Sequence, residues 1–168
     1  MLTRRDIIIK WSTYSAASLL LVALFTLTLR ETAFFGVHLF LPPLIVGVVA
    51  SLENTRAGAI FALGCGVLCD LTLCATFPCL YTVAFTLAAL SCSFLATNVL
   101  QPGVLCSLAV SALTFAYVDA LNMIALFLRA RAPFGVMADI ALRETLLSCA
   151  MLVVCHPVYT FLHRKFTL

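Results

Sequence analysis

Residues 41–71 read LPPLIVGVVASLENTRAGAIFALGCGVLCDL, and this stretch decides the fold. It holds two apolar runs, one opened by Pro42-Pro43 and one rich in glycine, joined by the polar segment Glu53-Asn54-Thr55-Arg56. Followed to their outer limits at Phe34 and Leu73, the two runs become Phe34–Leu52 and Ala57–Leu73, and apolar runs of about 17 to 25 residues have the length needed to cross a hydrocarbon core of about 30 Å. The stretch therefore predicts two membrane-crossing segments joined by a short polar turn.

The composition of the whole chain extends this prediction to all 168 residues. Apolar residues make up 64% and charged residues only 10%, with a mean hydropathy of +1.15. A soluble domain carries about a quarter charged residues, so there are too few charges here to cover a water-facing surface. The formal charge of +3 is dispersed, without the basic stripe that indicates nucleic-acid binding. We therefore expect a single all-α domain over residues 1–168 that lies in the lipid bilayer.

Clumps of charged residues divide the chain into about six transmembrane helices. The first span has a basic start but a long apolar body and no small-residue cleavage site, so we interpret it as a retained helix and not as a signal peptide. The longest polar segment, Arg129–Glu144, is expected to be a surface turn with amphipathic character. The expected spans are Trp11–Leu29, Phe34–Leu52, Ala57–Leu73, Leu80–Leu100, Val104–Leu128 and Thr145–Leu162.

The second span is expected to be broken at Pro42-Pro43. Proline lacks a backbone donor and disfavours helix in the residue before it. One interpretation is an irregular segment up to Leu41 followed by a helix that begins at the prolines; a simple proline kink is the other. Irregular backbone at membrane depth survives only when protein or water covers it. The broken segment should therefore face other helices.

Both ends of the chain are basic, which fits an even number of spans. With both termini in the cytoplasm, six Lys and Arg residues lie inside and four lie outside. An excess of Lys and Arg on the cytoplasmic side is the usual orientation signal. We therefore predict cytoplasmic termini.

Small residues recur at four-residue spacing along the third span. Gly58, Ala62, Gly66 and Asp70 stack on one helix face, and Gly64 broadens the groove. Small residues let a second helix approach closely where lipid supplies no hydrophobic drive for association. The stripe predicts a packing face, either for another helix of this chain or for a different protein.

Two carboxylates lie within apolar spans, where a charge is costly. Asp70 and Asp119 sit roughly 20 Å from the cytoplasmic ends of their helices at a rise of 1.5 Å per residue, with Asn122 one turn beyond Asp119. Arg143 enters from the same side and is predicted to pair with one of the two aspartates. The intramembrane polar cluster Asp70, Asp119, Asn122 and Arg143 is thus expected to be an ionic tie between helices. A ligand or ion site, or a helix-capping role for Asp70, is the alternative.

Other residue types give little indication of chemistry. Most of the eight cysteines lie inside apolar spans, where a free thiol acts as a small apolar residue; Cys74 and Cys79, which flank a loop, are the only plausible reactive pair. The histidines at 38, 156 and 163 have no second metal ligand at helical spacing and are interpreted as packing or interfacial residues. We expect no catalytic residue, no metal and no cofactor.

Residues 41–71 resemble the core signature of the bacterial rod-shape-determining MreD proteins. That signature is an apolar span opening around a proline, a polar turn, and a glycine-rich helix ending in Gly-x-(hydrophobic)2-x-Asp-Leu. Here the closing element is Gly66-Val67-Leu68-Cys69-Asp70-Leu71. Length, helix number and the basic ends also match, so the resemblance covers the whole chain loosely and about thirty residues well.

The resemblance implies a non-enzymatic inner-membrane component of the machinery that elongates rod-shaped bacteria. Its implied partners are the membrane-anchored scaffold MreC, a peptidoglycan glycosyltransferase and a penicillin-binding transpeptidase. The implied fold is similar to that of the substrate-binding subunits of energy-coupling-factor transporters.

Two other classes compete with this expectation. A vitamin-binding transporter subunit has similar length and span number, and the cluster around Asp70 and Asp119 could line its pocket. Such a pocket usually needs several converging aromatic and polar groups, which the loops here do not offer. A membrane enzyme would need a polar cluster at one interface, and only residues 129–144 come close.

Overall fold

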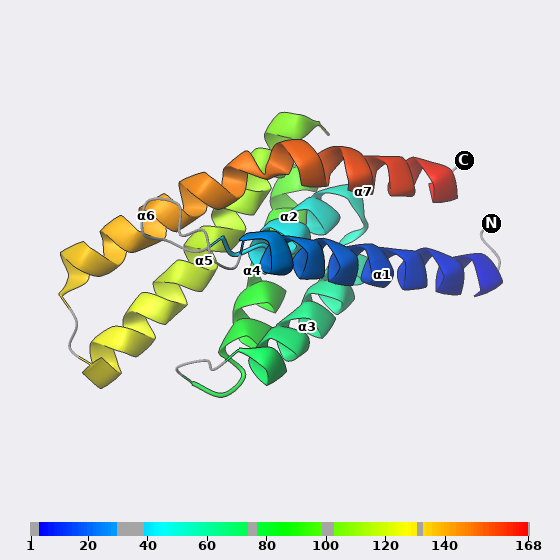
Figure 1. Cartoon of the computed structure of the whole chain (residues 1–168). Helices are drawn as coiled ribbons and strands as arrows, with labels where there is room; N and C mark the ends of the chain where they lie inside the picture. The colour runs from blue at the N-terminus through cyan, green and yellow to red at the C-terminus, as the bar shows by residue number, and fades with distance from the viewer. Residues whose placement is uncertain (1–3, 30–38, 74–76, 99–102, 131–132, 168) are drawn as a thin grey trace.

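The computed structural model describes residues 4–29, 39–73, 77–98, 103–130 and 133–167, and every regular element in these ranges is an α-helix (Figure 1). The predictions that concern Phe34 to His38, Cys74, Leu100 and Arg131 lie outside the described residues. The helices are α1 (Arg4–Leu29), α2 (Pro42–Leu52), α3 (Thr55–Thr72), α4 (Leu80–Asn98), α5 (Val104–Ala130), α6 (Phe134–Ala150) and α7 (Leu152–Thr167).

Helix α2 lies at the centre of the bundle (Figure 1). Its residues from Pro43 to Ala50 are all buried, as expected for a helix that is apolar on every side. One hydrophobic cluster joins α2 to α1 and α7, and a second joins it to α3, α4 and α5. A Cβ on Gly47 would lie only 2.8 Å from Cα of Ser111, so glycine is what allows α2 to approach α5 so closely. Residues 41–71, which include α2, therefore form much of the core.

The start of α2 coincides with the predicted break. Pro42 and Pro43 occupy the first helical turn, where a missing backbone N–H costs nothing, and the described residues 39–41 are not helical. Phe40 N–H donates instead to Ser148 Oγ at 3.4 Å. The described part of this segment is thus held by α6, a neighbouring helix.

The last two helices differ from the expectation. Arg129–Glu144 was predicted to be a surface turn, and this prediction is wrong because Phe134–Ala150 is one continuous helix. The backbone N–H of Met151 donates to Ser148 O at 3.0 Å, an i to i+3 bond that tightens the last turn of α6. The chain bends by 49° between α6 and α7. The predicted straight span Thr145–Leu162 is therefore replaced by a bent pair of helices.

Among the described residues, three helices are long and apolar enough to cross a membrane, and the bent pair makes up to four if α6 and α7 form one span. The three segments are Ile7–Phe25, Thr55–Thr72 and Val104–Leu128. Pro42–Leu52 and Leu80–Ala96 are shorter apolar helices. The described chain thus has the character of a helical membrane protein, and the number six stays a prediction.

Candidate functional site

The most concentrated polar site is a buried cluster around Glu53, which we call the Glu53 cluster: Lys10, Tyr14, Glu53 and His163. Lys10 Nζ lies 2.6 Å from Oε1 and 2.8 Å from Oε2 of Glu53. Tyr14 donates its hydroxyl to Oε1 at 3.0 Å, and His163 Nδ1 lies 2.9 Å from the same oxygen. The Glu53 side chain is only 7% exposed, so three donors compensate a carboxylate that has lost nearly all its water.

The cluster joins three elements that are far apart in sequence. Lys10 and Tyr14 come from α1, Glu53 follows the last residue of α2, and His163 belongs to the last turns of α7. Further into the bundle, the ring of Tyr14 stacks on that of Tyr159 at 5.8 Å and 12°. One turn along α1, Ser18 shares a 2.6 Å hydrogen bond with the Tyr159 hydroxyl. The Glu53 cluster and these contacts of Tyr159 together hold α1 against α7.

The balance of burial and charge decides the protonation state of Glu53. Burial raises the pKa of this carboxyl, but hydrogen bonds from Lys10 and His163 and the positive charge of Lys10 outweigh burial. The pKa of Glu53 is consequently held below its ordinary value of 4.5. The carboxylate is charged at neutral pH and serves as the counter-ion of Lys10.

This lowered pKa predicts a stability that depends on pH. The folded state binds fewer protons than the unfolded state, so the stabilisation is complete above pH 4.5 and is lost as the pH falls through the folded pKa. We expect the thermal midpoint in detergent to fall steeply below about pH 4.5. A Lys10→Met/Glu53→Leu variant removes the carboxyl and should show a shallower dependence. Parallel losses in both proteins would mean that Glu53 is not the responsible group.

A second site is formed where α3 meets the start of α4. Asp70 Oδ1 accepts the Tyr81 N–H at 3.0 Å, and Oδ2 accepts the Thr82 N–H at 2.9 Å and the Thr82 hydroxyl at 2.6 Å. The first N–H groups of a helix have no partner within it, and the helix dipole favours a negative charge there. Asp70 therefore caps α4 from a different helix, which corresponds to the capping alternative and not to the ionic tie.

The small-residue stripe leads directly to this cap. Gly58, Ala62 and Gly66 are buried, and a Cβ on Gly66 would lie 2.5 Å from Cα of Thr82. A Cβ on Gly58 would meet Cα of Ala50 at 3.3 Å. The stripe is thus covered by α2 and α4 of the same chain, and Gly66 brings the α4 backbone within reach of Asp70 one turn later.

Replacing Asp70 tests the cap. We expect Asp70→Ala to lower the free energy of unfolding by about 1–3 kcal/mol, because two backbone donors and a hydroxyl lose their acceptor in a partly buried place. Asp70→Asn keeps one acceptor oxygen and should cost less. Thermal unfolding in detergent measures both variants. Equal stability of wild type and Asp70→Ala would contradict the capping role.

The predicted pairing of Arg143 is wrong. Its guanidinium lies 2.8 Å from Asp139, four residues earlier on α6, with the two side chains 52% and 56% exposed. Asp139 lies on the same exposed face of α6 and so reaches Arg143 first, since residues four apart on a helix are neighbours. Asp119 instead accepts a hydrogen bond from Thr145 at 3.2 Å. Asp70 accepts the backbone N–H of Tyr81, and Asn122 lies beside the Tyr81 side chain.

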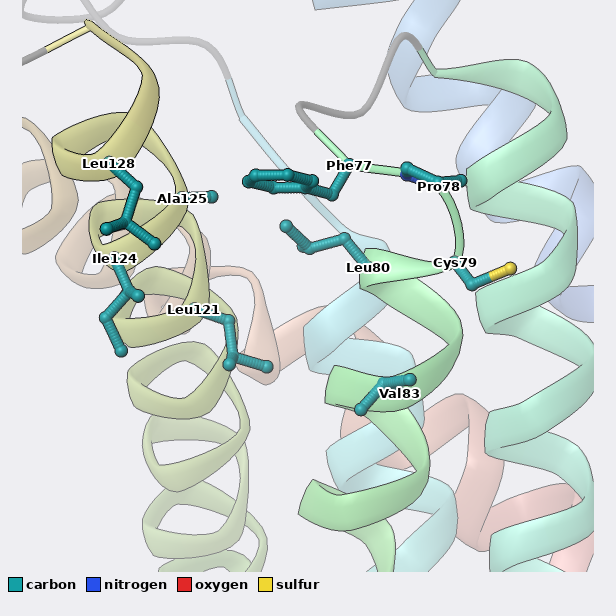
Figure 2. A pocket seen from close by; sticks show the side chains of 9 residues that line it. All are labelled: Phe77, Pro78, Cys79, Leu80, Val83, Leu121, Ile124, Ala125 and Leu128. Carbon is teal, nitrogen blue, oxygen red and sulfur yellow. The ribbon is translucent and has the colours of Figure 1, made fainter.

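An apolar groove of about 240 Å³ lies near this end of the molecule, between α5 and the start of α4 (Figure 2). Figure 2 shows Phe77 and Leu80 on one side and Leu121 and Ile124 of α5 on the other. The lining carries no charged group: Phe77, Pro78, Cys79, Leu80, Val83, Leu121, Ile124, Ala125 and Leu128. Cys79 is exposed and has a positive φ of 61°. The groove offers apolar contact but no charged group to orient a polar ligand.

Sequence reasoning missed the Glu53 cluster. The sequence predicts a polar turn at Glu53 and a packing or interfacial role for His163. It does not indicate their contact, since Glu53 is 43 residues from Lys10 and 110 from His163. One signal was available: Lys10 lies at the edge of an apolar span, where a buried ammonium needs an acidic partner.

No family model, curated protein or solved structure matches this chain. Its class therefore follows from sequence and structure alone: an all-helical protein, over the described residues, with several helices apolar and long enough to cross a membrane.

Proposed function

We propose that this chain is a non-enzymatic component of the bacterial cell-elongation machinery, related to the MreD proteins. It resides in the inner membrane as about six spans with both termini in the cytoplasm, in an architecture similar to the substrate-binding subunits of energy-coupling-factor transporters. There it links an MreC-like scaffold to a peptidoglycan glycosyltransferase and a penicillin-binding transpeptidase.

The observation that carries the proposal is the joint role of the signature residues Gly66 and Asp70. Both act on the backbone of α4 at Thr82: glycine allows the close approach, and aspartate caps the helix that approaches. Four-residue spacing puts both residues on one face of α3, and each of them has a role in the same contact with α4. This coincidence supports reading residues 41–71 as the MreD signature.

The arrangement of the polar residues favours a scaffold over the vitamin-binding alternative. Asp70 is used in capping α4, and Arg143 pairs on the surface with Asp139. The groove in Figure 2 is lined by apolar side chains and one thiol, whereas a polar vitamin needs convergent hydrogen-bonding groups. Exposed apolar side chains such as Ile60 and Leu71 on α3 face outward and suit lipid or a partner helix.

The proposal is tested by purifying the full chain with a C-terminal tag from its host in mild detergent, with quantitative mass spectrometry of associated proteins. We expect an MreC-like scaffold and peptidoglycan synthases to be enriched over a tagged, unrelated membrane protein. Enrichment of ATPase and coupling subunits would overturn the proposal.

A depletion experiment separates the two classes by phenotype. Depleted cells should lose their rod shape, and a Gly64→Ala variant should restore it because nothing lies within 4 Å of the added Cβ. A growth defect relieved by supplying a vitamin, with shape unchanged, would favour the transporter subunit.

A further inference from the structure

The charges of the described side chains are divided between the two ends of the bundle. The end that carries the Glu53 cluster also carries both termini, which lie on one side of the molecule in Figure 1. The charged side chains that the structure describes at this end are one acid, Glu53, and five cations, Lys10, Arg5, Arg56, Arg164 and Lys165; the side chains of Arg4 and Asp6, in the first turn of α1, are not among the described ones. The other described acids, Asp70, Asp119, Asp139 and Glu144, lie elsewhere, beyond the middle of α3 and α5 and in α6.

Four of these five cations have no anionic partner within the described part of the chain. Glu53 is 7% exposed and is occupied by Lys10. Arg5, Arg56, Arg164 and Lys165 are all exposed, and the ion pairs among described residues involve none of them. Among the described side chains, the surface around the buried cluster therefore carries more positive than negative charge.

The Glu53 cluster brings these cations together. Hydrogen bonds join Glu53 to Lys10 and to His163. Arg56 lies three residues after Glu53, and Arg164 and Lys165 directly follow His163. Arg5 lies five residues before Lys10, roughly 7.5 Å along α1. The headgroup layer on each face of a bilayer is about 5–7.5 Å thick, so Arg5 lies at the limit of such a layer and the other three cations lie within one turn of the cluster.

The neighbours of each cation indicate a lipid surface. Ile8 next to Arg5 is 65% exposed, Ile60 one turn from Arg56 is 73% exposed, and Phe161 one turn before Lys165 is 69% exposed. On three different helices, exposed charge gives way to exposed apolar surface within one turn. This is the pattern of a membrane–water boundary, where basic side chains reach the headgroups while the apolar residues face acyl chains.

We propose that the Glu53 end of the bundle is a docking surface for anionic phospholipid headgroups, formed by Arg5, Arg56, Arg164 and Lys165. The phosphate of an anionic headgroup is attracted to each of these cations. In a zwitterionic headgroup, the ammonium group largely cancels the attraction of the phosphate. The inference stands apart from the proposed function, since it requires neither an MreC-like partner nor a role in cell shape.

Trp11, the single tryptophan, gives a direct readout because it follows Lys10 on α1. The full chain is reconstituted in bilayers that contain brominated phosphatidylglycerol or brominated phosphatidylcholine, and quenching of Trp11 yields the relative association constant of the two lipids. We expect the anionic lipid to be favoured in wild type. Each cation removed should reduce the preference by about fivefold, as Arg56→Gln and Arg164→Gln/Lys165→Gln would show. One molar salt should abolish it.

Matched variants separate charge from structure. Arg143→Gln removes an exposed arginine that is already paired with Asp139 and should leave the preference unchanged. Arg164→Lys/Lys165→Arg keeps both charges and should retain it. Equal quenching by both lipids in wild type would overturn the proposal. An acidic protein segment would then be the remaining candidate ligand of this basic surface. An equal loss in Arg143→Gln would overturn it too, and Arg56→Gln remains informative if the double variant fails to fold.

Discussion

Replacing Glu53 by alanine is expected to lower the free energy of unfolding by about 3–5 kcal/mol, because the buried Lys10 ammonium then has no counter-charge. The Lys10 side chain is only 11% exposed, and its other described neighbour of note is the Tyr14 ring, 5.8 Å from Nζ. A cation–π contact of this kind compensates about 0.5–2 kcal/mol at most. Chemical or thermal unfolding in detergent measures the loss.

The double variant Lys10→Met/Glu53→Leu is the control for this experiment. Removing both charges leaves no unpaired ion, and replacement of a buried ion pair by apolar residues is often neutral. We expect most of the stability to return, although the Tyr14 hydroxyl and His163 lose their acceptor. If the single and double variants were equally unstable, the loss would come from those two donors and not from Lys10.

Gly66→Ala is the second substitution with a large expected effect. Its Cβ would lie 2.5 Å from Cα and 2.9 Å from N of Thr82, and these backbone atoms cannot rotate away. We expect a loss at the upper end of about 1–3 kcal/mol, the usual range for overpacking. Helix α4 must move outward, so the Asp70 hydrogen bonds to Tyr81 and Thr82 should lengthen as well.

Gly64→Ala provides the matched control on the same helix. Nothing lies within 4 Å of its added Cβ, and alanine is favoured over glycine in a helix by about 1 kcal/mol. This variant should equal or exceed the wild type in thermal midpoint. Similar behaviour of Gly64→Ala and Gly66→Ala would contradict the close α3–α4 contact.

The helices of the deciding stretch and of α5 could be predicted closely from sequence. The expected spans Ala57–Leu73 and Val104–Leu128 correspond to α3 at Thr55–Thr72 and α5 at Val104–Ala130. Apolar length and turn residues such as Gly103 mark these limits, and both are local signals. Pro42 likewise marks the start of α2, since proline suits the first helical turn.

Contacts between distant residues could not be predicted in the same way. Helical spacing reveals neighbours on one helix, so it placed Gly66 and Asp70 on one face but could not show that both meet Thr82. The sequence also predicts a pairing of Arg143 with a distant aspartate, although Asp139 lies one turn away, on a helix in a segment predicted to be a turn. That error arose because the charges in Arg129–Glu144 obscured the apolar face of α6.

The division of charge between the two ends also couples the molecule to the electrical potential of its membrane. An energised bacterial membrane is negative inside, and one elementary charge that crosses it changes energy by about 2.3 kcal/mol per 100 mV. Turning the bundle over would move Arg5, Arg56, Arg164 and Lys165 outward against this field, whereas the paired Asp139 and Arg143 carry no net charge across it. If the Glu53 end lies in the cytoplasm, the resting potential favours this orientation of the bundle over the inverted one.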